Sequence, residues 1–268
     1  MATTHVTTAG TTAGEALLAT TDRTAALLRA VRDPTRIARP ASWTIAETAA
    51  HILTELEDHA LYAETARRPD LPDGPAWTRG RAANAEQLER TTERDLRALA
   101  AQLRPAAERA VAALSGMEQV WSTNALLWGG EQTLRILLGE QLVHGRDIAR
   151  AAGLDWRIDP ADALLVADGA ISILPDYLRP VGNPRRQMSF EIRLRGGSAY
   201  RLEISGDTAT VGPAGGRVDC VISADPVAFL EVGYGRANPL AAALTGKLVA
   251  RGRKPWLGVA FGKLFAAP

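Results

Sequence analysis

The sequence predicts an α+β protein in which a helical bundle precedes a smaller domain that contains a β-sheet. Apolar residues recur at the spacing of amphipathic helices up to about Gly153, and the two-residue alternation of strands follows. At 268 residues the chain also exceeds the usual size of one domain, roughly 100 to 200 residues. We therefore expect three parts: a mobile tail over 1–13, a helical domain over 14–155 and a second domain over 156–268.

Four helices are expected in the first half, over residues 16–31, 44–66, 82–115 and 132–152. The second begins with Thr44 and has Glu47 three residues later, which is a capping-box pattern. Three prolines and a glycine make 69–78 a loop, and Pro105 is a point where the third helix can break. Gly153 is typical of a residue that ends a helix.

Alternating patterns in the second half predict strands over 188–195, 199–205, 208–211 and 218–223. Short helical patterns flank them, over 161–178 before the strands and over 226–232, 239–244 and 255–265 after them. Strands and helices that are grouped in this way indicate an α+β domain separate from the bundle.

Composition limits the classes of function. Hydrophobic residues make up 46% of the chain and charged residues 23%, as in globular proteins, and the net charge of +1 gives no basic surface typical of nucleic-acid binding.

The N-terminus lacks a signal-peptide pattern and no long apolar run occurs, so we expect a cytoplasmic protein without a membrane partner. Cys220 is the only cysteine, so thiol chemistry needs either it or an external thiol. Arginine-rich, lysine-poor usage is typical of an actinobacterial genome.

One constellation is suited to metal chemistry. Glu140 and His144 lie four residues apart on a predicted helix, so both side chains leave the same face and can bind one ion. His51, on the helix that begins at Thr44, is a candidate third ligand because bundle neighbours bring such positions together. Two histidines and a carboxylate occupy three coordination positions of an ion and leave at least one open, as in catalytic zinc sites. A thiol that binds at the open position has a lowered pKa.

Other interpretations of these residues remain open. His51, Glu55 and His59 form an alternative ligand set on one helix. A Glu and a His four residues apart also occur commonly as a solvated pair, and a single histidine as a core residue. If the metal site exists, Asp147 and Asp58 are candidates to accept hydrogen bonds from the imidazole N–H groups.

Two segments of the first half carry a resemblance to a known family. Residues 43–51 (WTIAETAAH) and 140–147 (EQLVHGRD) resemble motifs of the mycothiol-dependent maleylpyruvate isomerase family. The resemblance implies a DinB-like four-helix bundle with His51, Glu140 and His144 as metal ligands. It also implies mycothiol as the thiol co-substrate.

The second half resembles a sterol-carrier-like domain. Its matching segments are 225–230 (DPVAFL), 239–246 (PLAAALTG) and 247–252 (KLVARG). In the family, this domain closes the metal site and can supply an arginine to catalysis. Arg236 and Arg251 are therefore candidates to hold a substrate carboxylate through two hydrogen bonds.

The resemblance implies an enzyme but leaves its reaction open. Relatives use the metal and mycothiol either to isomerise a cis double bond or to transfer the thiol to an electrophilic small molecule. Because the sequence has no ring-cleavage context, we favour S-transfer, in detoxification or natural-product biosynthesis, over maleylpyruvate isomerisation. Two alternatives are a non-catalytic protein that binds a lipid or another small molecule, and a metal-dependent hydrolase that needs no thiol.

Overall fold

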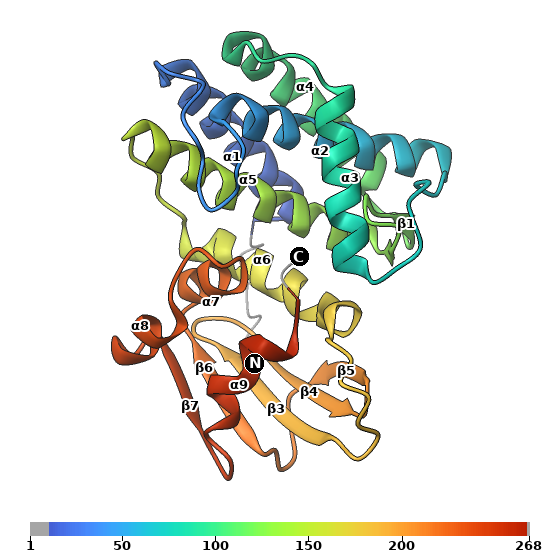
Figure 1. Ribbon diagram of the computed structural model, residues 1–268, viewed down its shortest axis with the longest axis vertical. Coiled ribbons are helices and arrows are strands. Elements are labelled where there is room, and N and C mark those ends of the chain that lie inside the picture. The colour runs from blue at the N-terminus through green and yellow to red at the C-terminus, as the bar shows by residue number, and fades with distance from the viewer. Residues whose placement is uncertain (1–10, 267–268) are drawn as a thin grey trace, which may run out of the picture.

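The computed structural model describes residues 11–266, and its first half is helical (Figure 1). The helices are α1 (Ala13–Ala30), α2 (Ile45–Thr65), α3 (Ala76–Arg90), α4 (Leu96–Leu114) and α5 (Gly130–Ala152). A short antiparallel hairpin, β1 (Val120–Trp121) with β2 (Leu127–Trp128), precedes α5. Helices α1, α2, α4 and α5 pack around a common core, while α3 lies against α2.

The predicted capping box of α2 is confirmed. Thr44 Oγ1 accepts a hydrogen bond from the Glu47 backbone N–H, and Glu47 in turn accepts one from the Thr44 backbone N–H. An equivalent box of Thr12 and Glu15 starts α1. Residues 1–10, the larger part of the predicted mobile tail, lie outside the described residues.

The sequence predicted one continuous helix over 82–115, and this prediction is wrong. Two helices occupy this stretch, because residues 91–95 leave the helical conformation and Asp95 caps the start of α4. Pro105 lies inside α4 without ending it. Helix α3 also begins at Ala76, within the segment predicted to be a loop.

The second half contains the predicted sheet. Its strands are β3 (Gln187–Leu194), β4 (Ala199–Ser205), β5 (Thr208–Pro213), β6 (Cys220–Ala224) and β7 (Leu248–Arg251), in the order β5-β4-β3-β6-β7. Only β3 and β6 run parallel among these neighbours. The helices are α6 (Pro160–Ile173), α7 (Pro226–Gly233), α8 (Pro239–Leu244) and α9 (Leu257–Leu264), with the 3-10 helix η1 (Leu174–Tyr177). The α+β class is thus confirmed, whereas β7 and the β1–β2 hairpin were not predicted.

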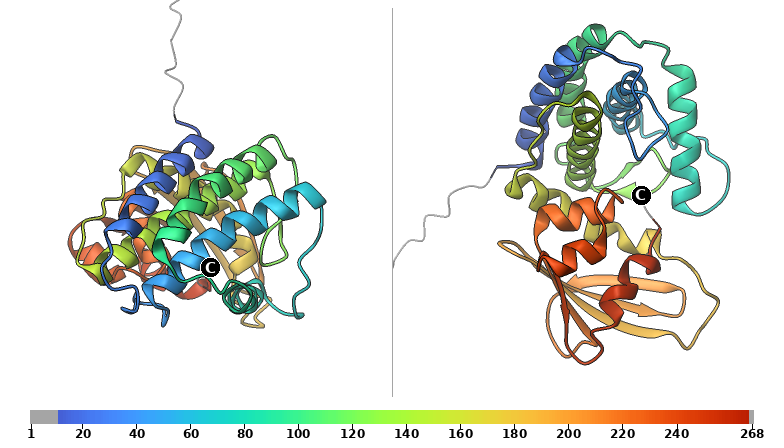
Figure 2. Two further views of the ribbon diagram at one scale, coloured as in Figure 1. Left: turned by 90° about the horizontal axis from the view of Figure 1, so that it is seen from above. Right: turned by 60° about the vertical axis from the view of Figure 1, so that its left-hand side comes forward.

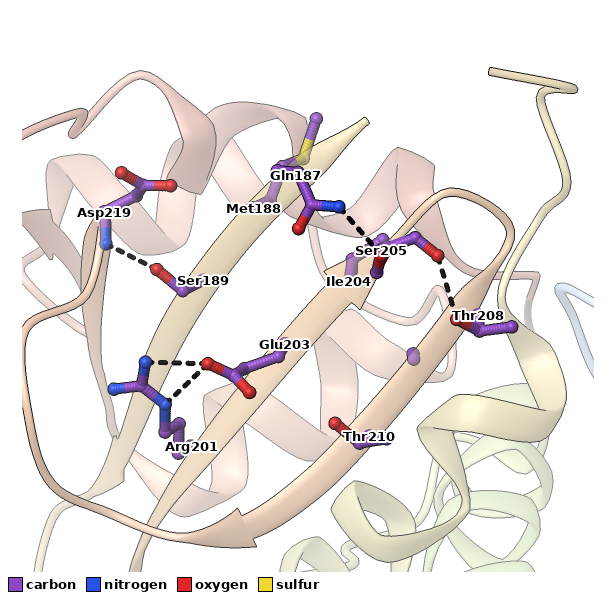
Figure 3. A pocket seen from close by; sticks show the side chains of 11 residues that line it. Gln187, Met188, Ser189, Arg201, Glu203, Ile204, Ser205, Thr208, Thr210 and Asp219 are labelled. Atoms are coloured by element: carbon purple, nitrogen blue, oxygen red, sulfur yellow. Dashed lines mark hydrogen bonds and ion pairs between the residues drawn. The ribbon is translucent and has the colours of Figure 1, made fainter. Parts of the chain in front are cut away.

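The two faces of the sheet differ in polarity. Phe190 and Ile192 point to one face, where residues of α6, α7 and α9 pack on them. The opposite face is polar and holds a hollow of about 310 Å³ lined by residues such as Ser189, Arg201 and Glu203 (Figure 3). The helix-covered face is therefore the one that can adjoin the bundle.

Helices α6 and α7 lie between the bundle and the sheet (Figures 1 and 2). An apolar cluster joins α5, α6 and α7 through residues that include Leu142, Val166 and Leu230. The contact is close, because a Cβ added to Gly139 of α5 would lie 2.9 Å from both Tyr234 Oη and a Val166 methyl group. From residue 11 to residue 266, none of the helices is long and apolar enough to cross a membrane.

Candidate metal centre

Three side chains converge where α2 packs against α5. His51 comes from the middle of α2, while Glu140 and His144 come from successive turns of α5. Their ligand atoms all lie within 4.8 Å of one another. The Glu140 carboxylate is central, with its Oε2 atom 3.6 Å from His51 Nε2 and 3.1 Å from His144 Nε2. The structure therefore brings together the three residues singled out in the sequence.

The alternative set of His51, Glu55 and His59 does not converge in this way. His59 Nδ1 lies 2.8 Å from the Glu55 backbone oxygen, so its imidazole is bound to its own helix. Within residues 11–266, no second group of three His, Cys, Asp or Glu side chains meets as closely as the first.

Gln87 of α3 fixes the orientation of His51. Its amide nitrogen donates hydrogen bonds to Glu55 Oε1 at 2.7 Å and to Asp58 Oδ2 at 3.0 Å. The amide oxygen therefore faces His51 Nδ1, 3.1 Å away, and must accept the N–H of that atom. Gln87 thus binds the Nδ1 side of the ring and leaves Nε2, which faces Glu140, as the atom available to a metal ion.

Asp58 was a candidate to accept a hydrogen bond from an imidazole, but in the structure Gln87 lies between Asp58 and His51. It accepts hydrogen bonds from Gln87 and from Arg90 Nη2, the latter at 2.8 Å to each carboxylate oxygen. Its connection to His51 therefore runs through Gln87, a residue that the sequence analysis did not identify.

Asp147 lies behind the second histidine, as proposed from the sequence. Its Oδ2 atom is 3.5 Å from His144 Nδ1. Arg236, which follows α7, donates to the same oxygen from Nε at 3.1 Å and from Nη2 at 2.7 Å. A further hydrogen bond, from Nη1 to the Tyr234 backbone oxygen, holds the guanidinium in place. Arg236 thus lines the cavity while its side chain is engaged mainly by Asp147.

The structure does not bring Arg251 to the site. It lies on β7, where it pairs with Val221, and it is exposed. Its neighbour Ala250 pairs with Ile222, whose side chain belongs to the helix-covered core. Because side chains alternate along a strand, Arg251 points to the opposite, polar face of the sheet.

The electrostatics of the trio favour a charged carboxylate. Burial opposes ionisation of Glu140, but hydrogen bonds and charge interactions with His144 and His51 hold its pKa well below the ordinary value. Burial would likewise lower the pKa of His144, yet Asp147 and Glu140 raise it to about 9. The ionised Glu140 carboxylate therefore lies between the two imidazoles.

A cavity of about 530 Å³ opens beside the trio and is bounded by both halves of the protein. The Trp43 ring covers the imidazoles, with its centroid 5.0 Å from that of His51 and 6.2 Å from that of His144. Such a volume is sufficient for a small-molecule ligand. Besides the trio and Trp43, its lining includes Glu55, His59, Trp77, Arg81, Asn84, Thr123, Tyr177, Arg179, Tyr234 and Arg236.

The residues present fit a divalent cation. Two imidazole nitrogens and a carboxylate oxygen are ligands that zinc binds in catalytic sites, and three protein ligands leave room for a fourth. Gln87 accepts a hydrogen bond from His51 Nδ1, and a carboxylate oxygen of Asp147 lies 3.5 Å from His144 Nδ1; acceptors on the far side of the ring are the usual support of a metal-binding imidazole. The arrangement can therefore hold an ion at the edge of a cavity large enough for a substrate.

Cys220 takes no part in this site. It lies on β6 with its side chain in the sheet core, and burial raises the pKa of its thiol. A neutral, buried thiol is a poor nucleophile. Any thiol that reacts at the candidate metal centre must therefore come from outside the chain.

Comparisons with known proteins agree with this architecture. Residues 17–149 match the mycothiol maleylpyruvate isomerase N-terminal domain, and residues 185–254 match the SCP-2 sterol transfer family. Two crystal structures of the mycothiol-dependent maleylpyruvate isomerase, one of a histidine-to-alanine mutant, align with TM-scores of 0.52 and 0.51 at 13% and 12% identity. Each alignment covers 89% of this chain and 91% of the other, which shows a shared fold. No curated protein gives a significant match.

Proposed function

The chain belongs to the mycothiol-dependent maleylpyruvate isomerase family, and we propose that it is an enzyme that uses a divalent metal ion to activate mycothiol. The observation that carries this proposal is the convergence of His51, Glu140 and His144 at the edge of a cavity. Zinc is the ion that best suits this ligand set, and the reducing cytoplasm is the compartment in which a free thiol persists. When bound, the ion lowers the pKa of a thiol beside it and so supplies a nucleophile at neutral pH.

The remaining residues prepare the site for that chemistry. Gln87 accepts a hydrogen bond from His51 Nδ1, and the Asp147 carboxylate lies 3.5 Å from His144 Nδ1, where its charge favours the orientation that presents Nε2. Trp43 covers the two imidazoles and limits the access of water. Arg179, from the second half, lines the cavity and offers guanidinium donors to an anionic acceptor substrate.

We favour S-transfer as the reaction. The thiolate sulfur forms a bond to an electrophilic carbon of a small molecule. In a substitution, the bond to a leaving group breaks, the leaving group takes the electron pair, and the thiol proton goes to solvent or to that group. In an addition, a π bond of the acceptor opens and the thiol proton ends on the product. The alternative is maleylpyruvate isomerisation, which the family and the two aligned structures support. In that reaction the sulfur adds to a cis double bond, rotation follows, and elimination returns the thiol.

Removal of a ligand tests the metal site. We expect Glu140→Gln and His144→Ala to weaken zinc binding by more than about 100-fold, since loss of an outer supporting group already costs 10–100-fold. Zinc content after dialysis and zinc titration measure the effect. Glu131→Gln is the matched control, because Glu131 lies on the same helix but is paired with Arg135 at the surface. Zinc binding that is unchanged in both ligand variants, or lipid bound in place of metal, would contradict the proposal.

Thiol stoichiometry distinguishes the two reactions. Zinc-loaded protein with mycothiol and a panel of electrophiles is expected to consume one thiol per product formed, as S-transfer requires. Maleylpyruvate is tested in parallel, and fumarylpyruvate formed without net loss of thiol would replace S-transfer with isomerisation. Turnover that is equally fast without any thiol would instead indicate a hydrolase that uses water.

A further inference from the structure

The cavity extends well beyond the candidate metal ligands. His51, Glu55 and His59 follow one another at four-residue intervals on α2, and all three line the cavity. Eight residues of α-helix correspond to a rise of about 12 Å between His51 and His59. A ligand bound at the metal centre can therefore reach His59 only if it carries an extended tail.

His59 holds an unused hydrogen-bonding atom in this distant part of the cavity. Its Nδ1 atom must carry the proton, because it lies 2.8 Å from the Glu55 backbone oxygen, which can only accept. In that tautomer, Nε2 has a bare lone pair. That atom is buried, in a side chain that is 1% exposed, and has no hydrogen-bond partner among residues 11–266. Because such an unsatisfied buried acceptor is costly, it indicates that a ligand supplies the missing donor.

Glu55 adds a second acceptor beside His59. Its Oε1 atom accepts a hydrogen bond from Gln87, while Oε2 has two long contacts, 3.4 Å to Thr123 Oγ1 and 3.5 Å to His59 Nδ1. Two neighbouring acceptors disfavour a carboxylate or a phosphate at this position. An apolar group is also disfavoured, because it would leave both acceptors unpaired.

The facing wall supplies groups of the opposite kind. Asn84 and Arg81 of α3 line the same cavity and carry N–H donors. Hydroxyl groups both donate and accept, so a ligand rich in hydroxyls can satisfy the two walls at once.

We propose that His59 and Glu55 form a second subsite of the cavity, which binds the hydroxyl-rich tail of the thiol. The inference rests on the proposed function, because it takes the thiol sulfur to lie at the metal centre. Mycothiol has the required chemistry, since it joins N-acetylcysteine to a polyhydroxylated sugar and cyclitol. The subsite selects such a thiol over a short one that carries the same sulfur.

Binding of two thiols to the zinc-loaded protein tests this subsite. Mycothiol and N-acetylcysteine are titrated by calorimetry into the unmodified protein and into His59→Leu. We expect the Kd for mycothiol to rise about tenfold in His59→Leu, as for loss of one buried hydrogen bond, while the Kd for N-acetylcysteine stays unchanged. His59→Gln keeps an acceptor on the side chain and should recover part of the loss.

Thr54→Val is the matched control on the same helix. Thr54 is buried and bonds to Ala50 and Thr91, but it does not line the cavity, so neither Kd should change. Equal losses for both thiols in His59→Leu, or no loss for either, would overturn the subsite and leave the proposed function in place. Absence of zinc-dependent mycothiol binding to the unmodified protein would overturn both.

Discussion

Asp147 links the candidate metal centre to the second half of the protein. It contacts His144 on one side and accepts hydrogen bonds from Arg236 Nε and Nη2 on the other. Its side chain is 4% exposed, so few water molecules can replace these contacts. A carboxylate in this position orients the imidazole and raises its basicity.

We expect Asp147→Ala to weaken zinc binding by about 10–100-fold, the usual cost of losing such a supporting group. Arg236→Met should weaken it less, because Asp147 remains beside His144. Since both residues act through one chain of contacts, the double variant should lose less than the two single losses combined. Zinc titration of all three variants measures these effects.

Arg146→Met is the control for this pair. Arg146 lies next to the site in sequence and forms an ion pair of 2.7 Å with Glu231 across the same interface. It lines no part of the cavity, so its loss should leave zinc affinity unchanged. A loss of zinc affinity in Arg146→Met as large as in Arg236→Met would show that the interface as a whole, and not the link through Asp147, supports the metal.

At the scale of elements, the accuracy of the sequence predictions depends on how local each feature is. Glu140, His144 and Asp147 lie on α5, so helical spacing alone places them near one another. His51 required a family resemblance, because its approach depends on how α2 packs against α5. Gln87 was missed for the same reason: it acts across a helix boundary, on an element whose bounds were themselves predicted wrongly.

The sheet shows a similar limit. The alternating patterns predicted four strands, but β7 has only four residues and ends at Arg251, so it gave no clear alternation. Without that strand, the face of the sheet to which the Arg251 side chain points could not be predicted. The pairing of Val221 with Arg251 decides it, since partners across a ladder point to the same face.

At the scale of the whole molecule, the bundle and the second domain are joined by more than the chain between them. Leu230 of α7 is 3% exposed and packs in the cluster that α5 and α6 share. Arg236 and Glu231 both bind residues of α5. A ligand that stabilises the bundle should therefore stabilise the second domain as well.

We expect calorimetry of the metal-free protein to show one thermal transition. Zinc at 1,000 times its Kd adds about 4 kcal/mol to the free energy of unfolding, which corresponds to a rise in Tm of about 10 °C for the whole transition. Leu230→Ala removes apolar contacts at the interface at a cost of about 2–5 kcal/mol. It should separate a second-domain transition that no longer responds to zinc.

Leu244→Ala is the control for this variant. Because Leu244 is 89% exposed, its loss should leave the single transition intact. Two transitions in the unmodified protein, only one of which moves with zinc, would mean that the domains are stabilised independently.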